Sequence, residues 1–333
     1  MPHLLRDLPA LDTARKRLEA LGYETLEEFQ AAAQVAGPEL ERYLGQQLDS
    51  LLSRIDVAAE SIPRDALQMI LMAEYPLGVD LAAVPRLMQA PWIIVEDQEP
   101  VGCVNLIAQM PPVGDQGNRG TCVAFASLSA YEHALTRAGA MHDLSEQYLY
   151  WNCKKNDGLS HVSGTYLGVA FPLLQRDGCC LEETWPYQPD VSPGNETQGP
   201  PPPGAQFTAL SFRLPSYRAL AATSVPDFLA GLRAGGVVSF SIPVFNSWYR
   251  SVAVAYSGTI TMPIPGEVRV GGHALCAVGC VELPGQPEIG GGRFIVRNSW
   301  GIRWGMNSSY GVGYGTLPYS YVARFGVEAY SVG

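Results

Sequence analysis

The amino-acid sequence predicts an α+β fold, with a small all-α domain ahead of a helical lobe and an antiparallel β lobe. Three observations favour this class. Apolar residues recur at helical spacing in an Ala-, Leu- and Glu-rich segment that covers residues 1–90. A second helical pattern follows Cys122. Beyond about residue 205, short apolar or alternating runs are separated by Gly and Pro, which is typical of antiparallel strands.

The N-terminal segment divides into short amphipathic helices. Asp12-Thr13 suits a helix start and Gly22 suits a helix end, which predicts a first helix over residues 11–21. Further helices are predicted from Glu24 onward, over residues 38–55 and over residues 63–72. Because its composition differs from the rest, this segment is predicted to be a separate domain of residues 1–90.

A connector of residues 91–103 is predicted to join this domain to a larger part, residues 104–333. The larger part divides into a helical lobe at about residues 110–200 and a β lobe at about residues 205–333. Helices are predicted after Cys122, from about Leu144 and from about Ser163. Strands are predicted over residues 237–242, 274–281 and 294–296, and the only helix predicted in the β lobe covers residues 225–234.

Charge and composition exclude several classes of partner. The formal net charge of −10 argues against nucleic acid and anionic membranes, because both need a basic surface. The N-terminus has no apolar stretch long enough for a signal peptide, and no later segment approaches a membrane span. We therefore expect a cytoplasmic protein or one exported by a leaderless route. The cysteines lack the paired C-x2-C spacing of a zinc site, so no metal is expected.

Three separated stretches carry reactive residue types. In residues 114–126, Gln116 precedes Cys122 by six positions, and the apolar run of a buried helix begins at Cys122. Helix N-termini favour thiolate over thiol, and the thiolate is the nucleophile. His273 opens a strand of small apolar residues, and Asn298 ends a β-rich run. The alternative is an ordinary buried cysteine, a structural histidine and a turn asparagine.

The order and spacing of Cys122, His273 and Asn298, with Asn298 followed by Ser-Trp-Gly, resemble the papain-like cysteine peptidases. The sequence is most similar to the shorter bacterial-type members, and the match runs from about Val104 to the C-terminus. The resemblance implies the papain-like two-lobe fold. It also implies a peptide or protein substrate bound between the lobes, and no cofactor.

The resemblance implies a role for each of these residues. Cys122 is the expected nucleophile, and His273 is the expected base and the acid that protonates the leaving amine. The side-chain oxygen of Asn298 is expected to orient the His273 ring, with Trp300 shielding that hydrogen bond from water. The side-chain amide of Gln116 and the N–H of Cys122 are expected to form the oxyanion hole.

Three further positions are expected to bind substrate. Gly164 matches the glycine whose backbone pairs with an extended substrate, and Ser163 stands where plant members have another glycine. Gly272, directly before the histidine, is expected to leave a roomy subsite for the second residue upstream of the cut.

The cysteine pattern departs from that of the plant members. Arg119 stands where they have a bridging cysteine, so that disulfide cannot exist here. Cys153 matches a second bridging position whose usual partner is missing. We hypothesise a substitute bridge to Cys179 or Cys180.

These observations predict a cysteine endopeptidase that works through a thioester acyl-enzyme. Two alternatives stay open: a catalytically silent interaction protein on the peptidase fold, and a relative that transfers its acyl group to an amine. The first is disfavoured because all four catalytic side chains are present. Residues 1–90 are either the inhibitory prosegment of a zymogen, whose connector occupies the cleft, or a docking module for a protein partner. We prefer a segment that packs on the catalytic part and limits access.

Overall fold

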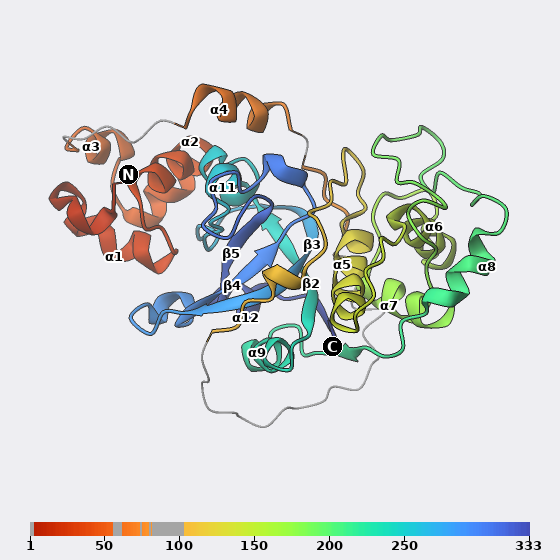
Figure 1. Ribbon diagram of the computed structural model, residues 1–333. Helices are drawn as coiled ribbons and strands as arrows, with labels where there is room; N and C mark the ends of the chain where they lie inside the picture. The colour runs from red at the N-terminus through yellow and green to blue at the C-terminus, as the bar shows by residue number, and fades with distance from the viewer. Residues whose placement is uncertain (1–2, 56–61, 74, 80, 82–102) are drawn as a thin grey trace.

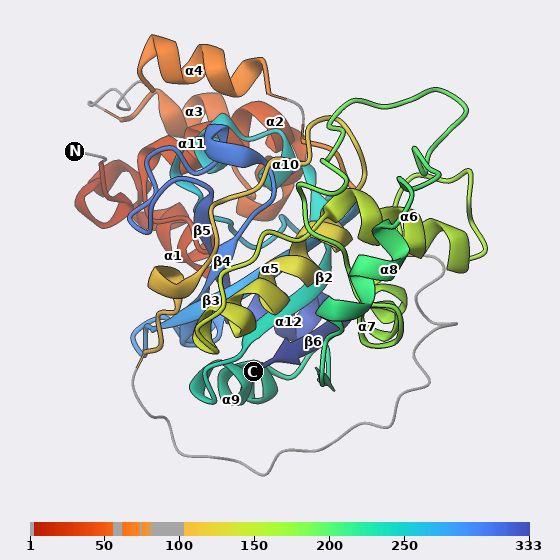
Figure 2. The ribbon, with the colours of Figure 1, turned by 45° about the vertical axis from the view of Figure 1, so that its right-hand side comes forward.

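The computed structural model describes residues 3–55, 62–73, 75–79, 81 and 103–333. It places a central β-sheet between the N-terminal helices on one side and a second group of helices on the other (Figure 1). A view turned by 45° shows the second group lying over one face of the sheet (Figure 2). The predicted α+β class is therefore confirmed.

Four α-helices, preceded by two short 3-10 helices (Leu5–Asp7 and Pro9–Leu11), make up the described N-terminal part. The α-helices are α1 (Asp12–Ala20), α2 (Leu26–Leu44), α3 (Leu48–Leu52) and α4 (Arg64–Leu71). Helix α2 begins at a capping box, in which Thr25 accepts a hydrogen bond from the N–H of Glu28 and the Glu28 carboxylate accepts one from the N–H of Thr25. It is kinked at Ala36, close to Pro38, because proline lacks an N–H and its ring clashes with the preceding turn.

The helical lobe is built around one buried helix. Its helices are α5 (Cys122–Arg137), α6 (Glu146–Asn156), α7 (Leu167–Arg176) and α8 (Ala205–Ala209). The first twelve residues of α5, from Cys122 to His133, are all buried. Helix α5 packs against strands β2 and β3 on one side and against α6 and α7 on the other. The predicted central helix thus positions the start of α5 at the junction of the two lobes.

The β lobe contains one six-stranded sheet, in the order β1-β6-β2-β3-β4-β5, and all neighbouring strands pair antiparallel. The strands are β1 (Arg218–Ala219), β2 (Val237–Phe245), β3 (Arg269–Glu282), β4 (Gly292–Arg297), β5 (Tyr314–Pro318) and β6 (Glu328–Val332). The last strand, β6, lies between β1 and β2. The C-terminal strand therefore lies inside the sheet and pairs with β2.

The β lobe holds more helices than the sequence predicts. The predicted helix is α9 (Val225–Arg233), and the structure adds α10 (Asn246–Tyr249), α11 (Val252–Ser257) and α12 (Tyr319–Phe325). The expectation of a single helix here is wrong. The added helices are only four to seven residues long, which is too short for a clear helical period in the sequence.

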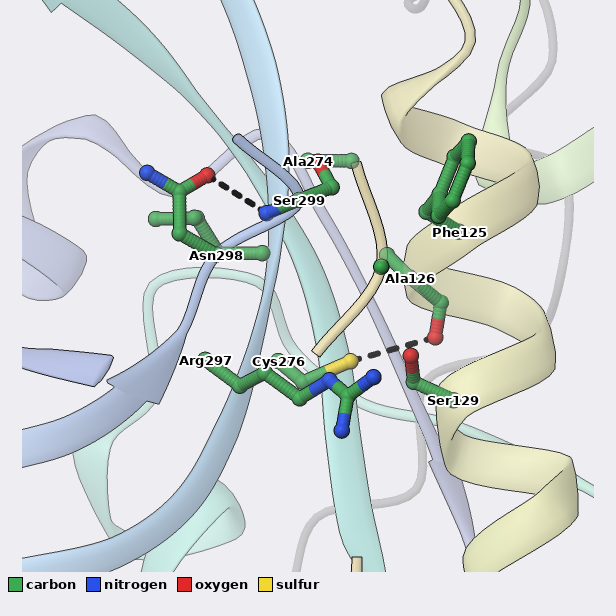
Figure 3. A pocket seen from close by; sticks show the side chains of 10 residues that line it. Phe125, Ala126, Ser129, Ala274, Cys276, Arg297, Asn298 and Ser299 are labelled. Atoms are coloured by element: carbon green, nitrogen blue, oxygen red, sulfur yellow. Dashed lines mark hydrogen bonds between the residues drawn. The ribbon is translucent and has the colours of Figure 1, made fainter. Parts of the chain in front are cut away.

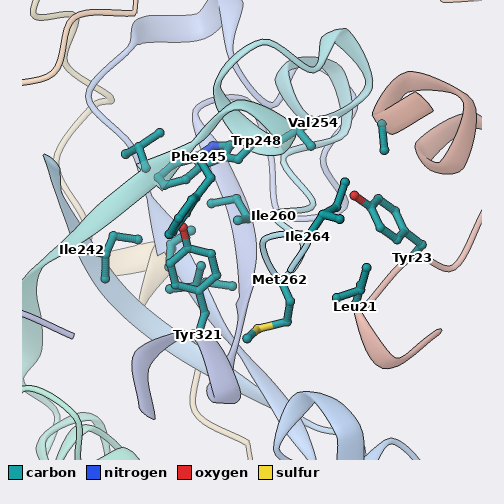
Figure 4. Close-up of a cluster of buried hydrophobic side chains, with 14 of the residues drawn as sticks. Leu21, Tyr23, Ile242, Phe245, Trp248, Val254, Ile260, Met262, Ile264 and Tyr321 are labelled. Atoms are coloured by element: carbon teal, nitrogen blue, oxygen red, sulfur yellow. The ribbon is translucent and has the colours of Figure 1, made fainter. Parts of the chain in front are cut away.

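The N-terminal helices share a hydrophobic core with the β lobe. Figure 4 shows Leu21 and Tyr23 facing Met262 and Ile264 across this contact. The N–H of Met262 donates to the carbonyl oxygen of Leu21 at 2.7 Å. The buried Arg293 donates to the carbonyl oxygens of Gly22 and Ile260, at 2.8 and 2.9 Å. The N-terminal helices are therefore fixed directly on the β lobe.

Among the described helices, none combines the length and the apolar character that a membrane crossing requires.

Candidate active site

Cys122 is the first residue of α5, and its side chain is fully buried. Burial raises the pKa of the Cys122 thiol to about 11, although the N–H groups of Ala274, Gly78 and Val123 lower it. These amides belong to strand β3, to the N-terminal part and to α5 itself. At neutral pH the sulfur is therefore a protonated thiol in this arrangement, in which residues 75–79 and 81 lie between the lobes (the closed arrangement).

His273 lies on β3, opposite Ile242 of β2, and its ring is also fully buried. Its Nε2 atom lies 2.8 Å from Oδ1 of Asn298. The same Oδ1 accepts a hydrogen bond from the N–H of Ser299 at 2.8 Å (Figure 3), so the amide presents its oxygen to the ring. The indole of Trp300 stacks on the imidazole at a centroid distance of 4.4 Å.

Burial lowers the pKa of His273 to about 4, although the hydrogen bond that Nε2–H donates to Asn298 Oδ1 raises it. The imidazole is therefore neutral at pH 7 in the closed arrangement. The other ring nitrogen, Nδ1, is buried without a hydrogen-bond partner among the described residues. The N–H of Ala274, the residue after His273 on β3, faces the Cys122 sulfur.

Gln116 is fully buried, and its side-chain amide is held at both ends. Its Oε1 accepts a hydrogen bond from the Ser299 hydroxyl at 2.6 Å. Its Nε2 donates to the carbonyl oxygen of Arg119 at 2.7 Å and to that of Pro76 at 3.2 Å. The Tyr187 hydroxyl donates to the main-chain oxygen of Gln116 at 2.9 Å. One amide N–H thus points at an oxygen that is supplied by the N-terminal part.

A small cavity lies between α5 and the sheet, lined by Phe125, Ser129, Cys276 and Arg297 and reaching Asn298 (Figure 3). Its volume of about 10 Å³ is close to the space that one water molecule needs. It is too small for a peptide side chain, so a substrate has to bind elsewhere.

Residues 75–79 and 81 lie between the two lobes. The Tyr75 ring lies 4.8 Å from the Trp300 ring, and the Trp300 Nε1–H donates to the carbonyl oxygen of Pro76 at 3.3 Å. Further along, the N–H groups of Gly78 and Val79 donate to the carbonyl oxygen of Gly272. The N–H of Thr165 donates to the carbonyl oxygen of Gly78 at 2.9 Å. This segment therefore hydrogen-bonds to both lobes.

Glycines allow this close approach. A Cβ atom at Gly78 would lie 2.2 Å from the carbonyl oxygen of Gly120. One at Gly164 would lie 2.5 Å from the carbonyl oxygen of Gly78, and one at Gly272 would lie 2.6 Å from that of Val79. The structure therefore puts both predicted substrate-binding glycines against the segment.

Two details around these glycines were not evident from the sequence. The N–H of Gly164 donates to Tyr150 Oη, and its carbonyl oxygen accepts a hydrogen bond from Lys154 Nζ. It is the N–H of the neighbouring Thr165 that donates to Gly78. The space beside Gly272 holds the side chain of Leu81. Ser163 lies at the same wall, with its Oγ near Gly120. A glycine within the run from Tyr75 to Leu81 is the only local signal of this close contact.

A sequence model of the family described as "Papain family cysteine protease" matches residues 105–317. The chain belongs to the papain family of cysteine proteases. In this papain-family protein, the matched residues include Gln116, Cys122, His273 and Asn298.

Known proteins with similar sequences or folds agree with this family. The chain is 30% identical over 219 residues to an uncharacterized peptidase C1-like protein of Acanthamoeba polyphaga mimivirus, covering 63% of this chain and 65% of that protein. Its fold is similar to that of xylellain, a cysteine protease from Xylella fastidiosa, with a TM-score of 0.60 at 23% identity over 78% of this chain and 94% of that one. The fold of digestive procathepsin L 3 from Tenebrio molitor larval midgut matches over 95% of both chains, with a TM-score of 0.53 at 16% identity.

The hypothesised disulfide of Cys153 is wrong. All seven cysteines lie in the described part of the chain, and all are free. The buried Cys179 thiol donates instead to the carbonyl oxygen of Ser145 at 3.3 Å. No group of three or more His, Cys, Asp or Glu side chains within the described ranges is arranged to hold a metal ion.

Proposed function

We propose that this papain-family protein is an endopeptidase whose nucleophile is Cys122. The observation that carries the proposal is the pairing of His273 Nε2 with Asn298 Oδ1 at 2.8 Å, on a strand whose next N–H faces the Cys122 sulfur. In this proposal Asn298 orients the imidazole so that its other nitrogen, Nδ1, can accept the proton of the Cys122 thiol. Gln116 and the N–H of Cys122 stabilise the oxyanion.

The reaction then follows from these positions. In the open groove, the His273 imidazole takes the thiol proton, and the Cys122 sulfur attacks the peptide carbonyl carbon. The tetrahedral oxyanion is stabilised by the Gln116 amide, and it collapses as His273 gives the proton to the leaving amine. A water molecule, deprotonated by His273, attacks the thioester carbonyl. The carbon–sulfur bond then breaks, the acid product leaves, and His273 returns its proton to the Cys122 sulfur.

We further propose that residues 75–79 and 81 limit access to this groove, and that the chain divides at about residues 90 and 103 into helical domain, connector and peptidase. Support comes from the hydrogen bonds of Pro76, Gly78 and Val79 to both lobes. The N–H of Gly78 faces the Cys122 sulfur, where a substrate would have to present a carbonyl carbon. Residues 91–102 of the predicted connector lie outside the described residues, and the proposal concerns residues 75–79 and 81.

The substrate class proposed is an extended peptide that takes the place of this segment. The Thr165 N–H and the Gly272 carbonyl oxygen, which now bond to Gly78 and Val79, would pair with its backbone. Ser163, Gly164 and Gly272 would form the walls beside it. Trp300 would contact the substrate residue that takes the place of Tyr75.

The test uses the full chain with one substitution that opens the groove. In Gly78→Glu the new side chain has no room beside Gly120, so residues 75–79 cannot stay in place. Gly285→Glu is the matched control, because a Cβ atom there meets open space. Cleavage of a quenched fluorescent peptide library would be measured, together with the intact mass after an epoxide inactivator of cysteine peptidases.

We expect Gly78→Glu to cleave peptides at least about tenfold faster than the natural chain and Gly285→Glu. It should carry one adduct, on Cys122, and Cys122→Ser should abolish both signals. A Gly78→Glu protein with neither turnover nor adduct would support the silent interaction protein instead. Product masses that contain an added amine would indicate acyl transfer.

A further inference from the structure

Arg119 is a buried arginine directly beside the candidate oxyanion hole, and it is 2% exposed. Its Nη1 donates to the Gln147 side-chain oxygen at 2.7 Å and to the Gln188 carbonyl oxygen at 2.8 Å. Its Nη2 donates to the Glu196 carbonyl oxygen at 3.2 Å. The side chain therefore joins the turn before Cys122 to helix α6 and to the loop after Tyr187.

Two aromatic rings hold the guanidinium. Its central carbon lies 5.2 Å from the centroid of Tyr150 and 5.3 Å from that of Tyr187. Among the described residues, the guanidinium forms no ion pair with a carboxylate. Burying a charge on neutral acceptors and ring faces is costly compared with burying an apolar side chain. A role other than stability therefore explains this residue better.

The backbone of the same residue sets the direction of the Gln116 amide. The Arg119 carbonyl oxygen accepts from Gln116 Nε2 at 2.7 Å and from the N–H of Thr121 at 2.9 Å. Only the second Nε2–H of Gln116 is left to point into the groove, where Pro76 now accepts it. A shift of the Arg119 carbonyl would thus move the amide that faces the oxyanion.

Tyr187 contacts both the Arg119 guanidinium and the turn that carries Gln116. Its ring contacts the guanidinium, and its hydroxyl lies 2.6 Å from Thr121 Oγ1 and donates to the main-chain oxygen of Gln116. The turn is therefore held by the Arg119 guanidinium and the Tyr187 hydroxyl, without a covalent bond.

We propose that Arg119 is a positioning residue: its guanidinium fixes the turn over residues 116–121 so that Gln116 presents one N–H to the oxyanion. This inference rests on the proposed peptidase function and deepens it. The guanidinium then holds this turn without a disulfide.

The test separates reactions that form an oxyanion from one that does not. Arg119→Met and Arg119→Lys would be made in the full-length Gly78→Glu protein, with Arg176→Met as the control. Arg176 lies on α7 of the same lobe and is exposed, with 64% of its side chain accessible. Three quantities would be measured: kcat and KM for a peptide amide, the inhibition constant of a peptide aldehyde, and the rate of Cys122 alkylation by iodoacetamide.

The chemistry of the three probes predicts different responses. Amide cleavage and aldehyde addition both place a negative oxygen at Gln116, whereas alkylation forms a carbon–sulfur bond and expels iodide without one. We expect Arg119→Met to lower kcat at least about tenfold with little change in KM, and to weaken the aldehyde by a similar factor. Alkylation should stay within about twofold, and Arg119→Lys should be intermediate because it keeps the charge between the rings.

Two results would overturn the inference. Unchanged turnover and aldehyde binding in Arg119→Met would show that the guanidinium does not position Gln116. A parallel loss of alkylation, turnover and melting temperature would show a purely structural role. If the Gly78→Glu parent itself has no turnover, both the proposed function and this inference fall, whereas an active parent with an unaffected Arg119→Met removes only the inference.

Discussion

The carbonyl oxygen of Pro76 lies 3.2 Å from Nε2 of Gln116, which is the side chain proposed to stabilise the oxyanion. The protein thus satisfies its own candidate oxyanion donor with a main-chain oxygen that comes from 40 residues earlier in the sequence. The same oxygen accepts from the Trp300 indole at 3.3 Å. Opening the groove therefore leaves two buried donors free for a substrate.

Acidic pH should loosen the closed arrangement. Burial lowers the pKa of His273 from 6.5 to about 4 while the groove is filled. The open arrangement binds the proton better, so the closed one loses stability as the pH falls from about 6.5 toward 4. We expect the alkylation rate of Cys122 in the natural chain, divided by that in Gly78→Glu, to rise at least about tenfold between pH 7.5 and pH 5. A ratio that does not change with pH contradicts this.

Removing the Asn298 amide should impair catalysis more than folding. Asn298→Ala takes away the oxygen that lies 2.8 Å from His273 Nε2. A hydrogen bond to a charged group contributes about 1.5–3 kcal/mol, which corresponds to a roughly 10- to 100-fold loss of kcat/KM. Steady-state kinetics in the Gly78→Glu background would measure it, with the exposed Asn307→Ala as the control. Equal kcat/KM for Asn298→Ala and its parent would remove the proposed role.

Arg293 should be required to fix the N-terminal helices on the β lobe. Arg293→Met leaves the carbonyl oxygens of Gly22 and Ile260 without their donor in a buried contact. We expect the free energy of unfolding to fall by about 2–4 kcal/mol, because buried acceptors lose bonds from a charged donor. Urea unfolding measures this, and the exposed Arg42→Met should change it by less than about 0.5 kcal/mol. A similar small change for Arg293→Met would show that the apolar contact alone holds the helices.

The buried pair of Lys154 and Asp157 should stabilise the wall of the groove. Both side chains are fully buried, at an N–O distance of 2.7 Å, and Lys154 Nζ also donates to the carbonyl oxygen of Gly164 at 2.7 Å. Lys154→Met should destabilise the protein by about 3–5 kcal/mol, because it leaves an uncompensated buried carboxylate. Adding Asp157→Asn should restore part of this loss in thermal unfolding. An additive double mutant would mean that the two side chains do not interact.

The fold was predictable where local pattern and burial agree. The apolar stripe after Cys122 becomes the buried helix α5, and the small-apolar run after His273 becomes strand β3. The short helices α10 to α12 escaped prediction because four to seven residues carry no clear period. The hypothesised bridge of Cys153 failed because matching a position in sequence does not bring two thiols together.

The candidate site was predictable as a set of residue types but not as a geometry. The order of Cys122, His273 and Asn298 in the sequence predicts the site. The hydrogen bonds that hold the Gln116 side chain could not be predicted from the sequence. Ser299, which donates to its Oε1, lies 183 positions away, and nothing in the local sequence marks its hydroxyl. The sequence singled out Arg119 only because the resemblance places a bridging cysteine at that position.

By itself, the sequence determined which side chains are available, which one begins a buried helix, and the family to which the chain belongs. Only the tertiary structure decided that residues 76–79 hydrogen-bond to both lobes, and that burial raises the pKa of the Cys122 thiol and lowers that of the His273 imidazole. The physical reason is that protonation state and access depend on burial. Burial here comes from contacts between distant parts of the chain, which local periodicity does not encode.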